Sequence, residues 1–152
     1  MQERILITMK ENPDVILRAF PGHFITPTAH SNYYLDMTAI KSRTHESRAA
    51  AIEFSKKIPP TTVVDTIVCM EGTQVIGAYL ADELTKNGIL NVNTYKAINV
   101  ITTELSSSGQ YIVRDNLKPM FEGKNVILLV ATAATGQTLA KTAEAIKYYG
   151  AK

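Results

Sequence analysis

Apolar runs alternate with amphipathic stretches along most of the chain. Residues 126–130 are five consecutive apolar residues rich in Val, Ile and Leu, which predicts a strand buried on both faces in the middle of a parallel sheet. Residues 63–69 predict a second buried strand. Each run is followed by a short glycine-containing loop and then by a helical pattern, over residues 138–146 and 75–87 respectively. The sequence therefore predicts an α/β fold with a mostly parallel central sheet flanked by helices.

The N-terminal third has weaker patterns. Apolar positions in residues 1–11 predict a short amphipathic helix, and residues 15–20 predict a strand that ends at a Pro-Gly turn. A further helix, capped by Ser42 or Thr44, is expected to run to Ile58 before a Pro-Pro pair.

The segment between the second helix and the last strand predicts a hairpin. Residues 93–104 and 110–114 are β-like runs, and the serine-rich stretch 105–109 between them has turn chemistry. A serine run of this kind is typical of a solvated turn, so no catalytic role is assigned to it. Residues 116–124, with a proline and a glycine, predict a loop.

The loop that follows residue 130 has the chemistry of an anion site. Unpaired backbone N–H groups at a helix start converge on whatever lies in front of them. Thr135 and Thr138 add hydroxyl donors, and Gly136 lets the backbone come close to a phosphate. The loop after residue 69 is open to two interpretations: Gly72 presents backbone N–H groups to an anion, or the loop is a tight turn without a ligand.

Two motifs resemble a known family. The strand at 126–130 with Thr135, Gly136 and Thr138 resembles the phosphoribosyl pyrophosphate (PRPP) loop of the type I phosphoribosyltransferases. A second motif resembles the orotate phosphoribosyltransferases of that family, and it consists of Ser31, Tyr33, Tyr34 and Asp36. The resemblance implies the Rossmann-like phosphoribosyltransferase type I fold as one domain over residues 1–152. It also implies transfer of phosphoribose from PRPP to a pyrimidine base, in pyrimidine nucleotide biosynthesis.

The resemblance also implies a site and its partners. It assigns the 5-phosphate to Ala134, Thr135, Gly136, Gln137 and Thr138, the pyrophosphate to Glu71, Gly72 and Thr73, and the base to Tyr33 and Tyr34. It further implies Mg²⁺ without an organic cofactor, and a homodimer with sites near the interface. Glu71 would repel a pyrophosphate unless a metal ion lay between them.

The chain departs from the family at charged positions. Val130 and Ala131 replace an acidic pair that holds the ribose hydroxyls in the family, so the catalytic residues are unknown. Pro27 replaces a family lysine, and of the further basic residues only Lys96 stands in a comparable place. The family's last strand and hood have no counterpart after Lys152. Two hypotheses remain: an orotate phosphoribosyltransferase-like glycosyltransferase, or a non-catalytic protein that binds a phosphorylated sugar or nucleotide with the same cradle.

Composition limits the classes of partner and the cellular compartment that we expect for the protein. A hydrophobic content of 45% and a net charge of +2 are those of an ordinary globular domain, and predict no nucleic-acid or membrane partner. The basic group Lys41, Arg43 and Arg48 either meets a phosphate or is a solvated helix start. The single cysteine, Cys69, precludes an internal disulfide and predicts a cytoplasmic protein. No metal ligands are predicted, because zinc-type spacing is missing from His23, His30 and His45.

Overall fold

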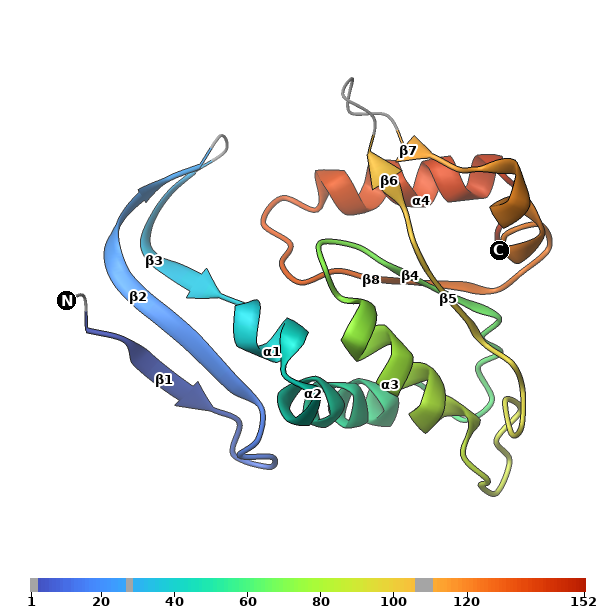
Figure 1. The fold of residues 1–152 in the computed structure, drawn as a ribbon, viewed down its shortest axis with the longest axis horizontal. Helices are drawn as coiled ribbons and strands as arrows, with labels where there is room; N and C mark the ends of the chain where they lie inside the picture. The colour runs from blue at the N-terminus through green and yellow to red at the C-terminus, as the bar shows by residue number, and fades with distance from the viewer. Residues whose placement is uncertain (1–2, 27–28, 106–110) are drawn as a thin grey trace.

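The computed structural model describes residues 3–26, 29–105 and 111–152, and it contains a parallel sheet between two layers of helices (Figure 1). The sheet has the order β5-β4-β8, with β4 (Thr66–Cys69) between β5 (Asn99–Thr102) and β8 (Val126–Leu129). Figure 1 shows α2 (Thr44–Lys57) and α3 (Gln74–Thr85) on one side of it and α4 (Gln137–Tyr148) on the other. The prediction of a mixed α/β fold with a parallel sheet flanked by helices is confirmed at this level.

Side chains of β4 alternate between two apolar clusters. Ile67 and Cys69 pack with α1 (Thr38–Ser42), α2 and α3, whereas Val68 packs with Phe121 and with Ile146 of α4. Because successive strand residues point to opposite faces, β4 contributes to both layers of the core. All four of its residues are buried.

The middle of the sheet is β4, which corrects the expectation that residues 126–130 are central. Three of the four residues of β8 are only half-buried, because the part of the chain that the structure describes places a full strand on only one side of it. On the other side Lys152 N donates to the Lys124 carbonyl at 2.8 Å, and Val126 N donates to the Lys152 carbonyl at 3.3 Å. These two bonds have the pattern of a single parallel pairing between Lys152 and Asn125.

Polar residues at the start of the central strand have hydrogen-bond partners in other segments; Thr66 is buried and Asp65 is half-buried. The Thr66 hydroxyl donates to the Met120 carbonyl at 2.6 Å. The Asp65 carboxylate accepts from the backbone and side-chain nitrogens of Asn125, each at 2.8 Å, and pairs with Lys96. These bonds connect the segments that precede β5 and β8 to the start of β4, so they fix the amino-terminal edge of the sheet.

An antiparallel sheet of β1 (Ile5–Thr8), β2 (Ile16–Ile25) and β3 (His30–Asp36) stands beside the helices (Figure 1). The helix predicted for residues 1–11 is therefore wrong: its described part contains a strand paired with β2 from Ile5↔Ala19 to Thr8↔Ile16. β-Branched residues favour this extended pairing.

The second strand also differs from its prediction. β2 does not end at the Pro21–Gly22 dipeptide but continues through it, with a register shift between Pro21 and Phe24. A bulge is one of the few places in a sheet where proline is tolerated, since it lacks the N–H of a regular ladder.

A buried ion pair joins the antiparallel sheet to the helical layer. Arg18 of β2 donates to both carboxylate oxygens of Glu46 in α2, at 2.6 and 2.8 Å. The two side chains are 7% and 6% exposed. The hydrogen bond from Arg18 is the main cause that lowers the pKa of Glu46, against the opposing effect of burial.

The helices begin and end close to the predicted residues, whereas the segment predicted as a long strand at 93–104 differs from its prediction. α2 begins at Thr44 and α3 at Gln74, but residues 93–98 are turn and irregular structure before β5 rather than strand. The hairpin is present as β6 (Glu104–Leu105) paired with β7 (Tyr111–Ile112). Of its predicted turn at residues 105–109, residues 106–109 lie outside the described ranges, as does Pro27. The expected loop at 116–124 contains the 3-10 helix η1 (Asp115–Met120).

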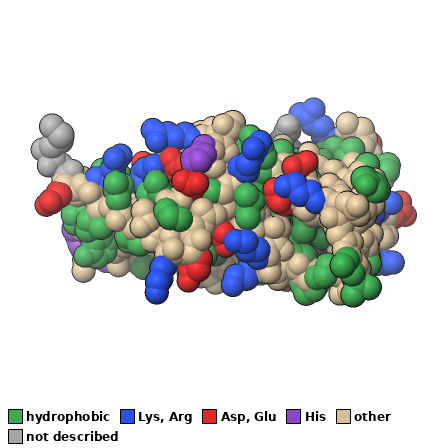
Figure 2. Space-filling view, turned by 90° about the horizontal axis from the view of Figure 1, so that it is seen from below, with side chains coloured by type: hydrophobic (Ala, Val, Ile, Leu, Met, Phe, Trp, Pro, Cys, Tyr) green, Lys and Arg blue, Asp and Glu red, His purple; other side chains and the backbone are tan. Residues whose placement is uncertain are grey.

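Charged side chains of both signs are interspersed on the face seen in Figure 2, which looks at the molecule from below the view of Figure 1. No single-sign patch dominates that face. The expectation that the protein has no nucleic-acid partner stays a prediction.

Removing one member of the buried ion pair should destabilise the fold strongly. Glu46→Ala leaves Arg18 charged and buried, which costs roughly 3 to 5 kcal/mol. The double variant Arg18→Met, Glu46→Leu should recover most of this loss, because it leaves no buried charge unpaired; Arg43, which also bonds to Glu46, is exposed. Urea unfolding measures both, with Asp115→Ala in the exposed Asp115–Lys118 pair as the control, expected to cost less than about 1 kcal/mol. Equal losses in the single and double variants would contradict the assignment.

Acid should weaken the amino-terminal edge of the sheet. Burial tends to raise the pKa of Asp65, but hydrogen bonds from Lys96 and Asn125 outweigh it and lower that pKa to about 2. The charged form is therefore favoured by the fold, so its stabilisation is fully present above the unfolded pKa of about 4 and is lost as pH falls through 2. Asp65→Asn should cost about 2 kcal/mol at pH 7 and progressively less between pH 4 and pH 2, as measured by urea unfolding of both proteins. A difference independent of pH would refute this.

Candidate functional site

Two loops meet at the carboxyl edge of the parallel sheet. One comprises residues 70–73, between β4 and α3, and the other comprises residues 130–136, between β8 and α4. Carboxyl ends of neighbouring parallel strands lie at the same edge of a sheet, where ligands bind in many open α/β folds. The two loops that sequence analysis singled out are thus neighbours in space.

The carbonyl of Leu129 fastens the two loops together. It accepts from Met70 N at 2.8 Å and lies 3.0 Å from the Thr73 hydroxyl, which also lies 2.8 Å from the Met70 carbonyl. The Thr73 residue is 1% exposed. A hydroxyl has one proton, so these two carbonyls share it. Thr73, which the resemblance assigns to pyrophosphate, has its side chain engaged within the protein.

A cavity of about 260 Å³ lies against the second loop. Its lining consists of residues 132–139 together with Val130 and Glu71. The five residues expected to hold a phosphate, 134–138, all lie on this wall. Glu71 comes from the other loop, so both loops face the same space.

Helix α4 starts at this wall without a capping side chain among the described residues. Its N-cap is Gly136, whose φ of +75° is a left-handed conformation that suits glycine, and whose carbonyl accepts from Ala140 N at 2.9 Å. The Gln137 amide has only a long contact of 3.4 Å with the Thr135 hydroxyl. The first amides of an α-helix have no intrahelical acceptor, so the start of α4 offers donors to an anion in the cavity.

Two side chains of opposite charge lie at the loop after β4: Glu71 belongs to the loop, and Lys41 contacts it from α1. Glu71 and Gly72 have φ values of +53° and +81°, and the Lys41 ammonium donates to the Glu71 carbonyl at 2.8 Å. Lys41 therefore reaches this loop from α1. Local sequence gives no signal for a contact between residues so far apart along the chain.

The other two basic residues of that group have partners elsewhere. Arg43 bonds to Glu46 at 3.3 Å, and the Arg48 guanidinium lies 4.8 Å from the centre of the Tyr79 ring. The structure therefore brings only one member of the group, Lys41, to the candidate site. Arg43 and Arg48 do not reach it.

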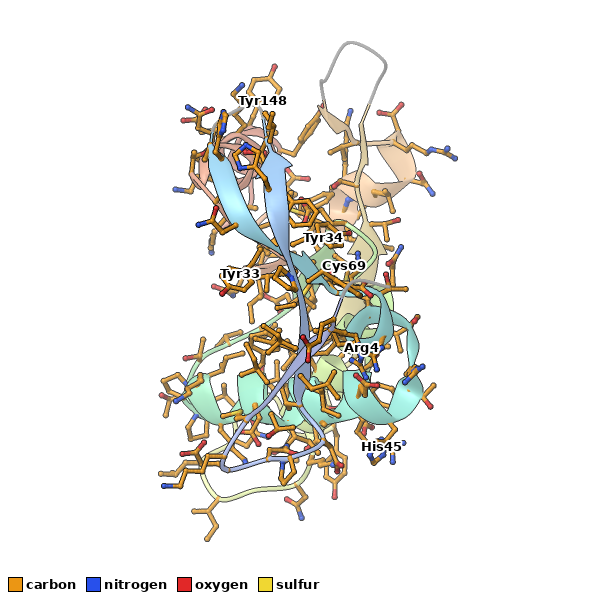
Figure 3. The ribbon with its side chains drawn as sticks, turned by 90° about the vertical axis from the view of Figure 1, so that its left-hand side faces the viewer. Arg4, Tyr33, Tyr34, His45, Cys69 and Tyr148 are labelled. Atoms are coloured by element: carbon orange, nitrogen blue, oxygen red, sulfur yellow. The ribbon has the colours of Figure 1, made fainter. Side chains whose placement is uncertain are left out.

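Tyr33 and Tyr34 lie on β3, in the antiparallel sheet that faces the viewer in Figure 3. They are 52% and 53% exposed, and the Tyr34 ring packs against Phe24 with 5.7 Å between centroids. Successive strand residues point to opposite faces, so the pair does not form one platform. In the described part of the chain, the residues that line the cavity include neither tyrosine.

Lys96 is held at the opposite edge of the sheet, because it pairs with Asp65 before β4 begins. It is therefore not brought to the cavity. Val130 and Ala131 lie at the carboxyl edge, next to the cavity. They stand where the family resembled has carboxylates, and their side chains are hydrocarbon only.

Titratable and metal-binding groups are sparse around the cavity. Burial raises the pKa of the Cys69 thiol to about 11, so this residue behaves as an apolar core residue. Among the described residues there is no group of three or more His, Cys, Asp or Glu side chains that could hold a metal ion, and Glu71 is the one carboxylate lining the cavity. His23 and His30 contact each other at 3.2 Å on the antiparallel sheet. No helix in the described ranges is both long and apolar enough to cross a bilayer.

No protein-family model matches this chain, and a search of curated proteins finds no match either. The resemblance to phosphoribosyltransferases therefore depends on the two sequence motifs alone.

Proposed function

We propose that the protein binds a phosphoryl group in the cavity at the start of α4. The observation that carries the proposal is an uncapped helix N-terminus that opens on a cavity of about 260 Å³. Phosphate fits such a place because the free amides and the helix dipole both favour negative charge. The ligands we expect are phosphomonoesters, among them sugar phosphates and nucleotides.

The charges around the cavity support binding more than they support catalysis. Lys41 favours an anion, whereas Glu71 opposes one. Val130 and Ala131 leave no carboxylate to hold ribose hydroxyls or Mg²⁺ on that loop. We therefore favour a non-catalytic phosphate-binding or regulatory protein over an active transferase.

Transfer of phosphoribose from PRPP to a pyrimidine base remains the second candidate. It is supported by the meeting of the two loops at one sheet edge, because a pyrophosphate and a 5-phosphate would need both. If it holds, Glu71 is the carboxylate of the cavity that would hold Mg²⁺, whose charge would offset the repulsion between Glu71 and the pyrophosphate. Turnover at roughly 1 to 1,000 per second with PRPP, orotate and Mg²⁺ would establish it over the binding function.

We also propose that the protein is a cytoplasmic homodimer. The antiparallel sheet supports dimerisation, because large apolar side chains on its strands are 40% to 72% exposed, namely Ile5, Leu6, Ile7, Ile25 and Leu35. The buried, unpaired Cys69 fits a reducing compartment.

Substitution of Gly136 should abolish phosphate binding. A Cβ there meets no atom within 4 Å, so the constraint is the positive φ rather than crowding. Gly136→Val adds roughly 1 to 2 kcal/mol of backbone strain and places a branched side chain where the anion would lie. Gly123→Val is the matched control, since Gly123 has φ +68° and open space at the other end of β8. Calorimetry with inorganic phosphate should show binding in the control and none in Gly136→Val; loss in both would contradict the site.

The two charges beside the cavity should change phosphate affinity in opposite directions. Lys41→Met should weaken binding of inorganic phosphate roughly fivefold and Glu71→Gln should strengthen it by a similar factor, because each charge acts with about 1 kcal/mol through a screened, water-like medium. Both effects should shrink as salt is raised. Lys57→Met, in the last turn of α2, is the control and should leave affinity unchanged. Changes of the same sign in both variants would refute an anion in this cavity.

A further inference from the structure

A second cavity of about 260 Å³ lies beside the first, between β2, the helices α1 and α2, and the end of β8. The antiparallel sheet forms its outer wall, and this sheet stands in front of the helices in Figure 3. Its lining is almost entirely apolar and includes Val15, Leu17, Met37, Ile40, Leu129 and Val130.

The polar groups in this lining already have partners. The Thr73 hydroxyl lies between the Met70 and Leu129 carbonyls, and the Glu53 carboxylate accepts from Asn12 at 2.9 Å and from Lys56 at 2.7 Å. Water in a cavity needs two to four polar partners, and apolar cavities of roughly 150 Å³ stay dry and bind benzene. This second cavity therefore suits a hydrocarbon group at least as large as a six-membered ring.

The two cavities adjoin at Val130, which lines both of them. The next residue, Ala131, lines the apolar cavity, and Thr132 lines the phosphate cavity. One loop thus separates a wall of backbone donors from a wall of hydrocarbon. A single ligand that crosses Val130 would place a charged group on one side and an apolar group on the other.

We propose that the ligand is a phosphomonoester whose organic part is apolar, with the phosphate at the start of α4 and the hydrocarbon in the second cavity. The proposal rests on the function proposed above and narrows its ligand class. A ribose in the second cavity would bury hydroxyls against Val130 and Ala131 without partners, which is unfavourable. A hydrocarbon gains affinity there, by up to about fourfold for each methylene group buried.

The test compares four probes by calorimetry: inorganic phosphate, hexyl phosphate, ribose 5-phosphate and 1-hexanol. Hexyl phosphate should bind at least tenfold more tightly than inorganic phosphate, whereas ribose 5-phosphate should bind no more tightly than inorganic phosphate. Equal affinity for hexyl phosphate and inorganic phosphate would overturn the inference and leave the phosphate site standing. Binding of 1-hexanol without binding of any phosphate would overturn both proposals.

Variants that fill the apolar cavity separate its role from that of the phosphate loop. Ala50 lines the cavity from α2. Ala50→Leu should leave the affinity for inorganic phosphate unchanged and should lower the affinity for hexyl phosphate to within twofold of it. Val15→Phe fills the same cavity from the residue before β2 and serves if Ala50→Leu fails to fold. Ala78→Leu makes the matched change at an exposed position of α3 and should keep the preference for hexyl phosphate. A preference that survives filling from both sides would place the hydrocarbon elsewhere.

Discussion

The candidate site depends on one backbone carbonyl, that of Leu129. It receives the Met70 amide and lies within hydrogen-bond distance of the buried Thr73 hydroxyl, so the loops after β4 and β8 are joined where the strands end. The bond from Met70 continues the parallel pairing of β4 with β8, and the contact with Thr73 extends the connection into the loop after β4. Glu71 and residues 132–139, which include the start of α4, line a common cavity at this edge of the sheet.

The chemistry of this edge follows from what stands around that junction. Val130 and Ala131 separate a wall of amide donors from an apolar chamber, whereas a carboxylate there would have made both sides polar. The positive charge that reaches the site comes from Lys41 on α1, and the negative charge comes from Glu71. These features favour recognition of a phosphate with little means of activating it.

Local sequence patterns predicted those helices and strands whose secondary structure does not depend on contacts with distant segments. The strands within 63–69 and 126–130 and the helices that follow were predictable from runs of apolar residues and from glycine positions. The order of strands was not, because it depends on contacts between segments far apart along the chain, among them the hydrogen bonds of Thr66 with Met120 and of Asp65 with Asn125. The strand β1 was mistaken for a helix, since only its pairing with β2 distinguishes the two.

The loop proposed to bind phosphate could be singled out for the same reason, because the residues that line its cavity are contiguous from Ala134 to Thr138. Lys41 and the apolar cavity could not be, since the contacts that create them join residues far apart along the chain. Tyr33 and Tyr34 show the converse limit. Their motif is local and intact, but the fold carries it on a separate sheet away from the lining of the cavity.

If the function proposed above holds, a ligand at the start of α4 would also stabilise the fold, because no side chain among the described residues caps this helix. An anion seated at Gln137 would complete the first turn of the helix, and any ligand that binds only the native state raises the free energy of unfolding, by about 2.7 kcal/mol at a hundredfold excess over its Kd. Such a shift lowers the unfolded fraction that cellular proteases can degrade. Metabolite supply would then govern how much of this chain persists in the cell, without any change in its synthesis.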